Sequence, residues 1–262
     1  MEVKMFKNLG VQLYTIRDFM GDPDFADVAF GKLAEMGYTE AHTAGNAFDA
    51  KLFCELLEKH GIKIIGTHYD GNDIFNNPEE TIRVHQMWGT TTVGIGGMPM
   101  PPRTNLDELK KFIAECNRVA EIYAKAGMKL SYHNHSFEFV RIDGYKTIMD
   151  LLCEGLDPAT TSFVLDTCWV AAGGGDVVSW IEKLEGRIDI LHLKDMTLKQ
   201  KNGVYQPEMC EIGYGNLSWD PIMAAAEKVG VKHYVVEQDA YFTGSPFNSL
   251  KMSADFLKKY MA

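Results

Sequence analysis

Three residues whose side chains commonly bind metal ions stand at matching places in the second half of the chain. Asp166, His192 and Glu237 each lie at or near the end of a short run of β-branched and apolar residues. Two carboxylates held close together repel each other, and a divalent cation between them removes that repulsion. If the three runs are neighbouring strands, these side chains form the ligand set of one divalent metal ion.

Alternation of side chains along a strand gives these residues a common orientation. In the run from 188 to 194, Leu191 and Leu193 suit a layer of helices, so His192 and Lys194 face the other way. The same parity applies to further polar residues at the ends of runs: Asp166, Glu237, Asp239, His133 and His135. We therefore expect acids and several imidazoles to converge on one end of the fold.

Each of these residues also has an ordinary structural explanation when it is considered alone. An aspartate at a strand end often caps a loop, and a single buried histidine is more often a core residue than a ligand. Glu237 has a possible ion-pair partner in Lys194. The metal hypothesis depends on all three residues sharing height and parity on successive strands.

The elements that must position these residues alternate between strand and helix along the chain. The predicted strands are residues 9–14, 38–41, 62–69, 91–95, 129–135, 161–166, 188–194 and 233–237, and a long polar loop is predicted between residue 194 and the helix that begins at Asp220-Pro221. Strict alternation demands a parallel sheet, and eight units of roughly 30 residues favour closure into a barrel. We predict one (β/α)8 barrel domain of the α/β class over residues 1–262, with its site at the carboxyl ends of the strands. An open, doubly wound sheet is the alternative, although the GxGxxG motif expected after its first strand is missing.

The composition limits the classes of function. The chain has 262 residues, 36 acidic and 26 basic, a formal net charge of −10, and basic residues that are spread singly. Such a surface repels phosphate backbones, so we expect no nucleic acid partner. The five cysteines include no CxxC pair, and no run is apolar enough for a signal peptide or a membrane span. We expect a soluble, cytoplasmic protein with reduced thiols.

Five motifs make the chain similar to a known family. They are Gln12–Asp18, Tyr132–Phe139, Leu165–Trp169, His192–Asp195 and Val236–Asp239. In order and spacing they resemble the sugar phosphate isomerase/epimerase family of xylose isomerase-like barrels, over nearly the whole length. The resemblance implies one divalent metal ion, of the Mn, Mg, Co or Zn type, held by residues after the fifth to eighth strands. On that pattern Asp166, His192 and Glu237 fill the last three positions.

The first ligand position, on the fifth strand, has two candidates. Many family members carry Glu-x-His there, whereas this chain has His133-Asn134-His135. Either His133 takes the position, or Glu138 reaches back from just beyond the strand. We favour Glu138 as the fourth metal ligand, because a hard cation with one histidine already bound gains more from a third carboxylate. An ion pair with Arg141 is the structural alternative for Glu138.

Other polar residues at inward or loop positions would contact a sugar. Tagatose-epimerase-like members carry a histidine three residues after the aspartate, where this chain has Trp169. Its indole would either stack on a sugar ring or close the barrel as an apolar plug. The remaining candidates for substrate binding, each with an equally good structural role, are Gln12, Glu40, His68, His133 and Glu211.

The resemblance implies a metal-dependent isomerase or epimerase of carbohydrate metabolism that acts on a sugar or sugar derivative. The metal would polarise a carbonyl and an adjacent hydroxyl, and a base would remove the α proton to give a metal-stabilised enediolate. Glu237 or His135 is the expected base, with Lys194 and Glu138 as further catalytic residues. Expulsion of a β substituent after the same step would make the chain a dehydratase or lyase on an inosose or 3-keto-glycoside.

Two other classes compete with a sugar enzyme. A DNA-repair endonuclease on this type of barrel would need additional metal-binding histidines, and Trp169 stands where one is required. A non-catalytic sugar-binding barrel would hold no metal and would leave ketoses unchanged. The sequence contains no evident phosphate cradle, and it is compatible with a homo-oligomer.

Overall fold

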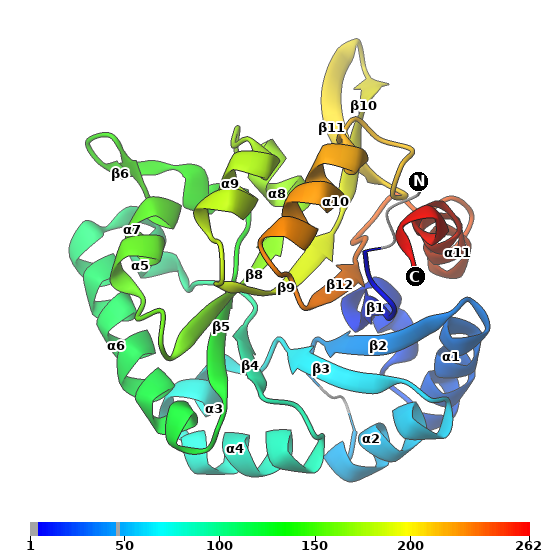
Figure 1. The fold of residues 1–262 in the computed structure, drawn as a ribbon, viewed down its shortest axis with the longest axis horizontal. Coiled ribbons are helices and arrows are strands. Elements are labelled where there is room, and N and C mark those ends of the chain that lie inside the picture. Colours follow the sequence, from blue (N-terminus) through cyan, green and yellow to red (C-terminus); the bar gives the residue numbers. More distant parts are fainter. Residues whose placement is uncertain (1–4, 46–47) are drawn as a thin grey trace.

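Eight parallel strands form the wall of a barrel within residues 5–45 and 48–262, the part of the chain that the computed structural model describes (Figure 1). Their order around the wall is β3-β2-β1-β12-β9-β8-β5-β4. The strands are β1 (Leu9–Gln12), β2 (Tyr38–Thr43), β3 (Lys63–Thr67), β4 (Thr92–Ile95), β5 (Lys129–His133), β8 (Thr161–Asp166), β9 (Ile188–Leu193) and β12 (His233–Val236). Between the two end strands of this order, a parallel bridge joins Tyr69 to Ile95 and brings the wall close to closure. The (β/α)8 barrel expected from the alternation of runs is confirmed.

Helices follow the strands and pack on the outside of the wall. The α-helices are α1 (Pro23–Glu35), α2 (Ala50–Lys59), α3 (Gly71–Asn76), α4 (Pro78–Met87), α5 (Met100–Thr104), α6 (Leu106–Lys125), α7 (Ile148–Gly155), α8 (Thr167–Ala172), α9 (Val177–Lys183), α10 (Trp219–Lys228) and α11 (Pro246–Leu257). Shorter 3₁₀ segments are η1 (Leu13–Phe19), η2 (Ser136–Phe139) and η3 (Lys258–Tyr260). In α1 the Asp22 carboxylate accepts hydrogen bonds from two backbone N–H groups and Pro23 opens the first turn, so the helix begins where its sequence caps it.

The core consists of a large layer between strands and helices and a small cluster inside the barrel. The inner cluster contains Val164, Ile190 and Val235, all fully buried. Leu191 and Leu193 belong to the outer layer, as their parity predicts. Side chains alternate along each strand. The residues of β8, β9 and β12 that lie between those of the outer layer therefore point toward the barrel axis.

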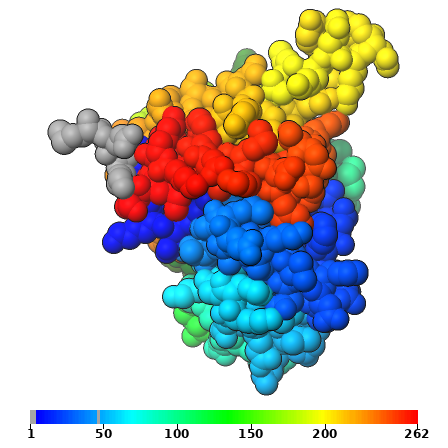
Figure 2. Space-filling model, turned by 90° about the vertical axis from the view of Figure 1, so that its right-hand side faces the viewer, coloured from blue at the N-terminus to red at the C-terminus, as the bar shows by residue number. Residues whose placement is uncertain are grey.

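A β-hairpin projects from the barrel where the sequence predicted a long polar loop. It consists of β10 (Asp195–Lys201) and β11 (Val204–Cys210), and it stands away from the rest of the molecule in Figures 1 and 2. The loop prediction was wrong because it overlooked the turn residues Asn202 and Gly203, which both adopt positive φ. Asn-Gly at two such positions is the strongest short-range signal for a hairpin.

The base of the hairpin is attached to the barrel by one carboxylate. Asp195 accepts hydrogen bonds from the backbone N–H groups of Gly213, Gly215 and Leu217 and from the indole N–H of Trp219. These contacts link the segment that leaves the barrel after β9 to the segment that returns to it before α10.

Two further strands, β6 (Arg141–Asp143) and β7 (Lys146–Thr147), pair in a small antiparallel ribbon between β5 and α7. Among the described residues, no helix is both long and apolar enough to cross a membrane.

Candidate metal centre

Four potential ligands meet at the carboxyl ends of four neighbouring strands. His133 ends β5, Asp166 ends β8, His192 lies near the end of β9, and Glu237 directly follows β12. One ligand atom from each lies within 4.8 Å of the others, and all four residues are buried. His192 Nδ1 is 2.9 Å from Glu237 Oε2 and 4.0 Å from Asp166 Oδ2, which is 3.7 Å from His133 Nε2.

The chemistry of this donor set fits a divalent metal ion. Two carboxylates and two imidazoles are ligands that Zn²⁺ and the other first-row divalent ions accept. His133 Nε2 is buried and has no hydrogen-bond partner. Buried polar atoms are rarely left in this state unless a ligand satisfies them. The four residues would therefore hold the ion that the sequence led us to expect.

Lys194 places a buried cation among the carboxylates of the site. Its ammonium lies 3.1 Å from Asp166, 2.8 Å from Glu237 and 3.0 Å from Asp239. Burial alone would lower the pKa of Lys194, but the three carboxylates raise it well above the usual value. Burial raises the pKa of Asp239 to about 6, with Glu237 adding to the effect. The ammonium therefore stays charged and partly balances the acidic residues.

Glu138 does not take the place that we expected for it. Its carboxylate accepts hydrogen bonds from the Tyr132 hydroxyl, at 2.6 Å, and from the His135 backbone N–H, at 2.8 Å. Burial raises the pKa of this carboxyl to about 7. The 3₁₀ turn η2 holds the side chain against the backbone at its own start, away from the other ligands. The choice of Glu138 over His133 therefore does not fit the geometry, and these two bonds stand where the structural alternative had an ion pair with Arg141.

A cavity of about 270 Å³ opens beside the four ligands. Its lining includes His68, His133, His135, Lys194 and Glu237. Burial, followed by the neighbouring His133, lowers the pKa of His135 to about 3, so the ring is neutral. The cavity is large enough for a molecule of a few carbons and oxygens, and it places neutral imidazole, ammonium and carboxylate groups around it.

The structure separates the remaining candidates for substrate contact into two groups. Gln12 and His68 lie at the site, and the Trp169 ring is near His135, with 5.7 Å between the ring centroids. Glu40 is a correction, because it bonds to His233 at the first residue of β12, which is the opposite end of the barrel.

Glu211 is a second correction. Its carboxylate accepts hydrogen bonds from Ser249 Oγ and the Thr243 N–H, so it holds α11 and the loop before it and does not line the cavity.

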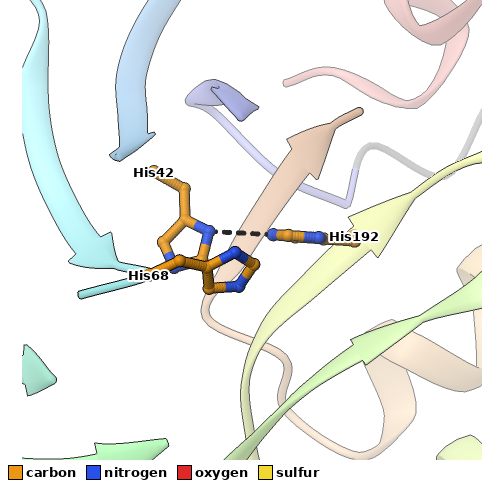
Figure 3. A group of neighbouring side chains, drawn as sticks. All are labelled: His42, His68 and His192. Atoms are coloured by element: carbon orange, nitrogen blue, oxygen red, sulfur yellow. Dashed lines mark hydrogen bonds between the residues drawn. The ribbon is translucent and has the colours of Figure 1, made fainter. Parts of the chain in front are cut away.

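Sequence reasoning overlooked His42, which forms a second group with the half-buried His68 and the buried His192 (Figure 3). The predicted strand over residues 38–41 ended two residues before the observed end of β2 at Thr43, and its alternation would have placed position 42 inside the barrel. Glycines make room for these rings. A Cβ on Gly66 would lie 3.0 Å from His42 Cδ2, and a Cβ on Gly96 would lie 2.9 Å from His68 Cβ.

Comparison with known proteins places this arrangement among related chains. The model of the family described as xylose isomerase-like TIM barrel matches residues 30–260. A protein named inosose dehydratase from Mesomycoplasma hyopneumoniae (strain 7448) is 26% identical over 277 aligned residues, which span 92% of this chain and 90% of the relative.

Two solved structures extend the comparison. A sugar phosphate isomerase/epimerase from Parabacteroides distasonis ATCC 8503 has a TM-score of 0.80 and 25% identity, and the match covers 97% of this chain and 94% of that one. The IOLI protein with a binding zinc atom has a TM-score of 0.69 and 14% identity, over 97% of this chain and 98% of that one. At that identity the second likeness concerns the fold alone.

Proposed function

The chain belongs to the xylose isomerase-like TIM barrel family, and from that premise we propose that it is a divalent-metal-dependent enzyme acting on a keto sugar or keto cyclitol. Its reaction begins with removal of the proton on the carbon next to a carbonyl. Asp166, His192, Glu237 and, in place of Glu138, His133 are the proposed metal ligands. The zinc atom in the structurally similar IOLI protein supports a divalent ion, whose identity here we leave among Zn, Mn, Mg and Co.

One observation carries this proposal: four ligand atoms from four strands meet in a buried position, beside a cavity that also contains a neutral histidine and an ammonium group. A purely structural cluster would be expected to satisfy its own polar atoms. Here His133 Nε2 and His135 Nδ1 are buried without hydrogen-bond partners. Such atoms at one place fit a site that is completed by an ion and a substrate.

The side chains around the cavity have different roles in the proposed reaction. When bound, the divalent ion supplies the Lewis acidity that polarises the carbonyl and acidifies the neighbouring C–H. His135, whose Nδ1 has no partner and whose ring lines the cavity, is the first choice for the base. Lys194 donates a proton or a hydrogen bond to the substrate oxygen that gains negative charge. Trp169 closes the side of the site next to His135 and keeps water away from the reacting carbon.

Two outcomes follow the shared first step. The relatives named inosose dehydratase align with most of this chain, which supports loss of a β-hydroxyl group as water. The neighbour named sugar phosphate isomerase/epimerase supports return of the proton to the substrate, as we expected from the sequence. Lys194 serves either outcome, because an ammonium group can protonate a leaving hydroxyl or a developing alkoxide.

Solvent exchange of the α proton tests the proposal and separates the two outcomes. The metal-loaded protein is incubated in D₂O with a panel of ketoses and inososes, and the products are followed by proton NMR. Deuterium incorporation with a new unsaturated or deoxy product indicates a dehydratase, and incorporation with an isomeric sugar indicates an isomerase or epimerase. Asp166→Asn is expected to abolish exchange, and His85→Asn, which alters a buried histidine outside the cavity, is the matched control. Exchange that persists at the wild-type rate in Asp166→Asn would contradict the proposal.

A further inference from the structure

Gln12, His42 and His192 form a buried chain of side-chain contacts on the far side of the candidate metal ligand His192. Gln12 Nε2 lies 2.8 Å from His42 Nδ1, and His42 Nδ1 lies 2.9 Å from His192 Nε2 (Figure 3 shows the second contact). The other nitrogen of His192, Nδ1, faces Glu237 and Asp166. The three side chains are fully buried.

The orientation of the Gln12 amide follows from a backbone contact. The N–H of Tyr14 donates to Gln12 Oε1 at 3.2 Å. A backbone N–H can only donate, so the oxygen of the amide lies on that side and the NH₂ group lies on the side of His42. The NH₂ group in turn can only donate. His42 Nδ1 must therefore be an acceptor and carry no proton.

This fixes the proton on the next ring. Since His42 Nδ1 is an acceptor, His192 Nε2 must be the donor in the 2.9 Å contact between them, and the single lone pair of His42 Nδ1 is shared by the N–H groups of Gln12 and His192. A neutral imidazole carries a single N–H, so a neutral His192 with its proton on Nε2 has a free lone pair on Nδ1. This nitrogen lies 2.9 Å from Glu237 Oε2, so in this tautomer both atoms of the contact are acceptors, and a cation bound by both is needed to make the contact favourable.

We propose that Gln12 and His42 are positioning residues that hold His192 in the Nε2–H tautomer and so present Nδ1 as the metal-binding atom. The inference rests on the proposed function, because it requires a metal ion at this site. Partners of the non-ligating nitrogen of a metal-bound histidine fix the tautomer and the ring orientation, and their loss weakens metal binding. In this arrangement the proton of the His42 ring is on Nε2, which has no hydrogen-bond partner, and this is unfavourable.

A second ion between His42, His68 and His192 is the competing explanation for this group of rings. Its three ligands would include no carboxylate to offset the added charge. His192 Nε2 and His42 Nδ1, which face each other, are also already engaged in a contact at hydrogen-bond distance. We therefore expect the wild-type protein to bind one ion per chain.

Gln12→Glu provides the sharpest test. The carboxylate keeps the acceptor for Tyr14 but replaces the NH₂ donor with a second acceptor, which calls for a proton on His42 Nδ1. His192 Nε2 then becomes the acceptor, and its proton moves to Nδ1, where it blocks the metal. We expect Zn²⁺ affinity, measured by isothermal titration calorimetry, to fall roughly 10- to 100-fold. A simple charge effect would strengthen binding of the cation, so unchanged or tighter binding would overturn the inference.

Substitutions of His42 separate positioning from folding. His42→Leu removes the acceptor and is expected to weaken Zn²⁺ binding to a similar extent. In His42→Asn the side-chain oxygen can take the place of Nδ1, so we expect binding to recover most of the wild-type affinity. His85→Asn, at a buried histidine that touches none of the ligands, should leave the affinity unchanged. Equal loss in His42→Leu and His42→Asn, with thermal unfolding like that of the wild type, would contradict the positioning role.

NMR of the wild-type protein tests the tautomer directly and does not depend on whether any variant folds. With ¹¹³Cd²⁺ and ¹⁵N-labelled histidine, we expect scalar coupling from cadmium to His192 Nδ1 and a proton retained on Nε2. Coupling to Nε2, or binding of two ions of which His42→Leu loses one, would overturn the inference. Absence of metal binding by the wild type would instead overturn the proposed function. One bound ion that is indifferent to Gln12 and His42 would overturn the positioning role alone.

Discussion

Buried histidines occur in two regions of this barrel, and the two regions treat them differently. His85, on α4, has both ring nitrogens paired, one with Thr67 Oγ1 at 2.8 Å and one with the Thr81 carbonyl at 2.7 Å. At the carboxyl ends of the strands, four histidines each keep one buried nitrogen without a partner: His42, His68, His133 and His135. His85 completes its hydrogen bonding within the chain, as a structural residue should. The four histidines at the strand ends leave nitrogens unpaired, which is typical of a site that binds an ion or a substrate.

The largest effect is expected from a substitution among the proposed metal ligands, next to the histidines whose nitrogens lack partners. Asp166→Asn keeps the shape of the side chain and its acceptor for the Trp169 N–H but replaces a charged ligand atom with an amide. We expect metal affinity to fall more than the roughly 10- to 100-fold typical of changes outside the ligand set. Native mass spectrometry and calorimetry measure the loss. His85→Asn is the control with wild-type metal content, and a fully loaded Asp166→Asn protein would show that the ligand assignment is wrong.

Removal of the ion should lower the melting temperature of proteins with an intact metal site, whatever the residue at position 85. At a concentration of roughly 100 times its Kd, an ion that binds only the folded state stabilises it by about 2.7 kcal/mol. For a chain of this size that corresponds to a rise in melting temperature of roughly 5–10 °C. A chelator should reverse the rise in the wild type and in His85→Asn, whereas Asp166→Asn should show none. If neither metal nor chelator changed the melting temperature of the wild type, the result would argue against the metal site.

His85, whose two ring nitrogens are both paired, should make the free energy of unfolding depend on pH. Burial lowers the pKa of His85 from 6.5 to about 4, so in this interval the unfolded state binds a proton that the folded state does not. The stabilising effect is therefore present above the unfolded pKa and is lost as the pH falls toward the folded one. Between about pH 7.5 and about pH 5 the loss amounts to roughly 2 kcal/mol.

Urea unfolding of the wild type and of His85→Gln at both pH values measures this loss. We expect a smaller pH dependence in the variant, since glutamine does not titrate. Equal pH dependence in the two proteins would show that His85 is not the group responsible.

The smallest effect on stability is expected at Trp169. Its indole Nε1 is buried and has no partner, so Trp169→Phe removes no internal hydrogen bond. We expect the free energy of unfolding to fall by about 1 kcal/mol, the typical effect of a single substitution. If the N–H serves the substrate, KM rises about 5- to 10-fold, which corresponds to the usual value of one hydrogen bond. An unchanged KM would assign the indole a packing role.

The sequence was sufficient for the barrel and for the meeting of His133, Asp166, His192 and Glu237 at its end, although it ranked His133 below Glu138 as the fourth ligand. Period-two alternation reports which side of the wall a residue faces, and it placed His192 and Lys194 correctly. It does not report height along the barrel axis. Glu40 faces the interior but lies at the opposite end, where it pairs with His233.

Local hydrogen bonding explains the error at Glu138. A glutamate three residues after the residue that begins a helical turn tends to bond back to the N–H at that start, which is the pattern of a capping box. His135 and Glu138 have this spacing, and the 2.8 Å bond between them follows it. The general preference of a hard cation for carboxylates was therefore outweighed by a nearer donor. His133, which stands on the strand itself, needs no such turn to reach the site.

The attachment of the hairpin through Asp195 has a consequence for how such proteins can diverge. One carboxylate, adjacent to Lys194 in the chain, holds the returning backbone at Gly213 and Gly215. The segment between these points can be lengthened, shortened or given a new sequence while the barrel beneath it keeps its geometry. The exposed hairpin, which carries Leu198 and Tyr205, is thus a segment where new specificity can arise without altering the site at the barrel end.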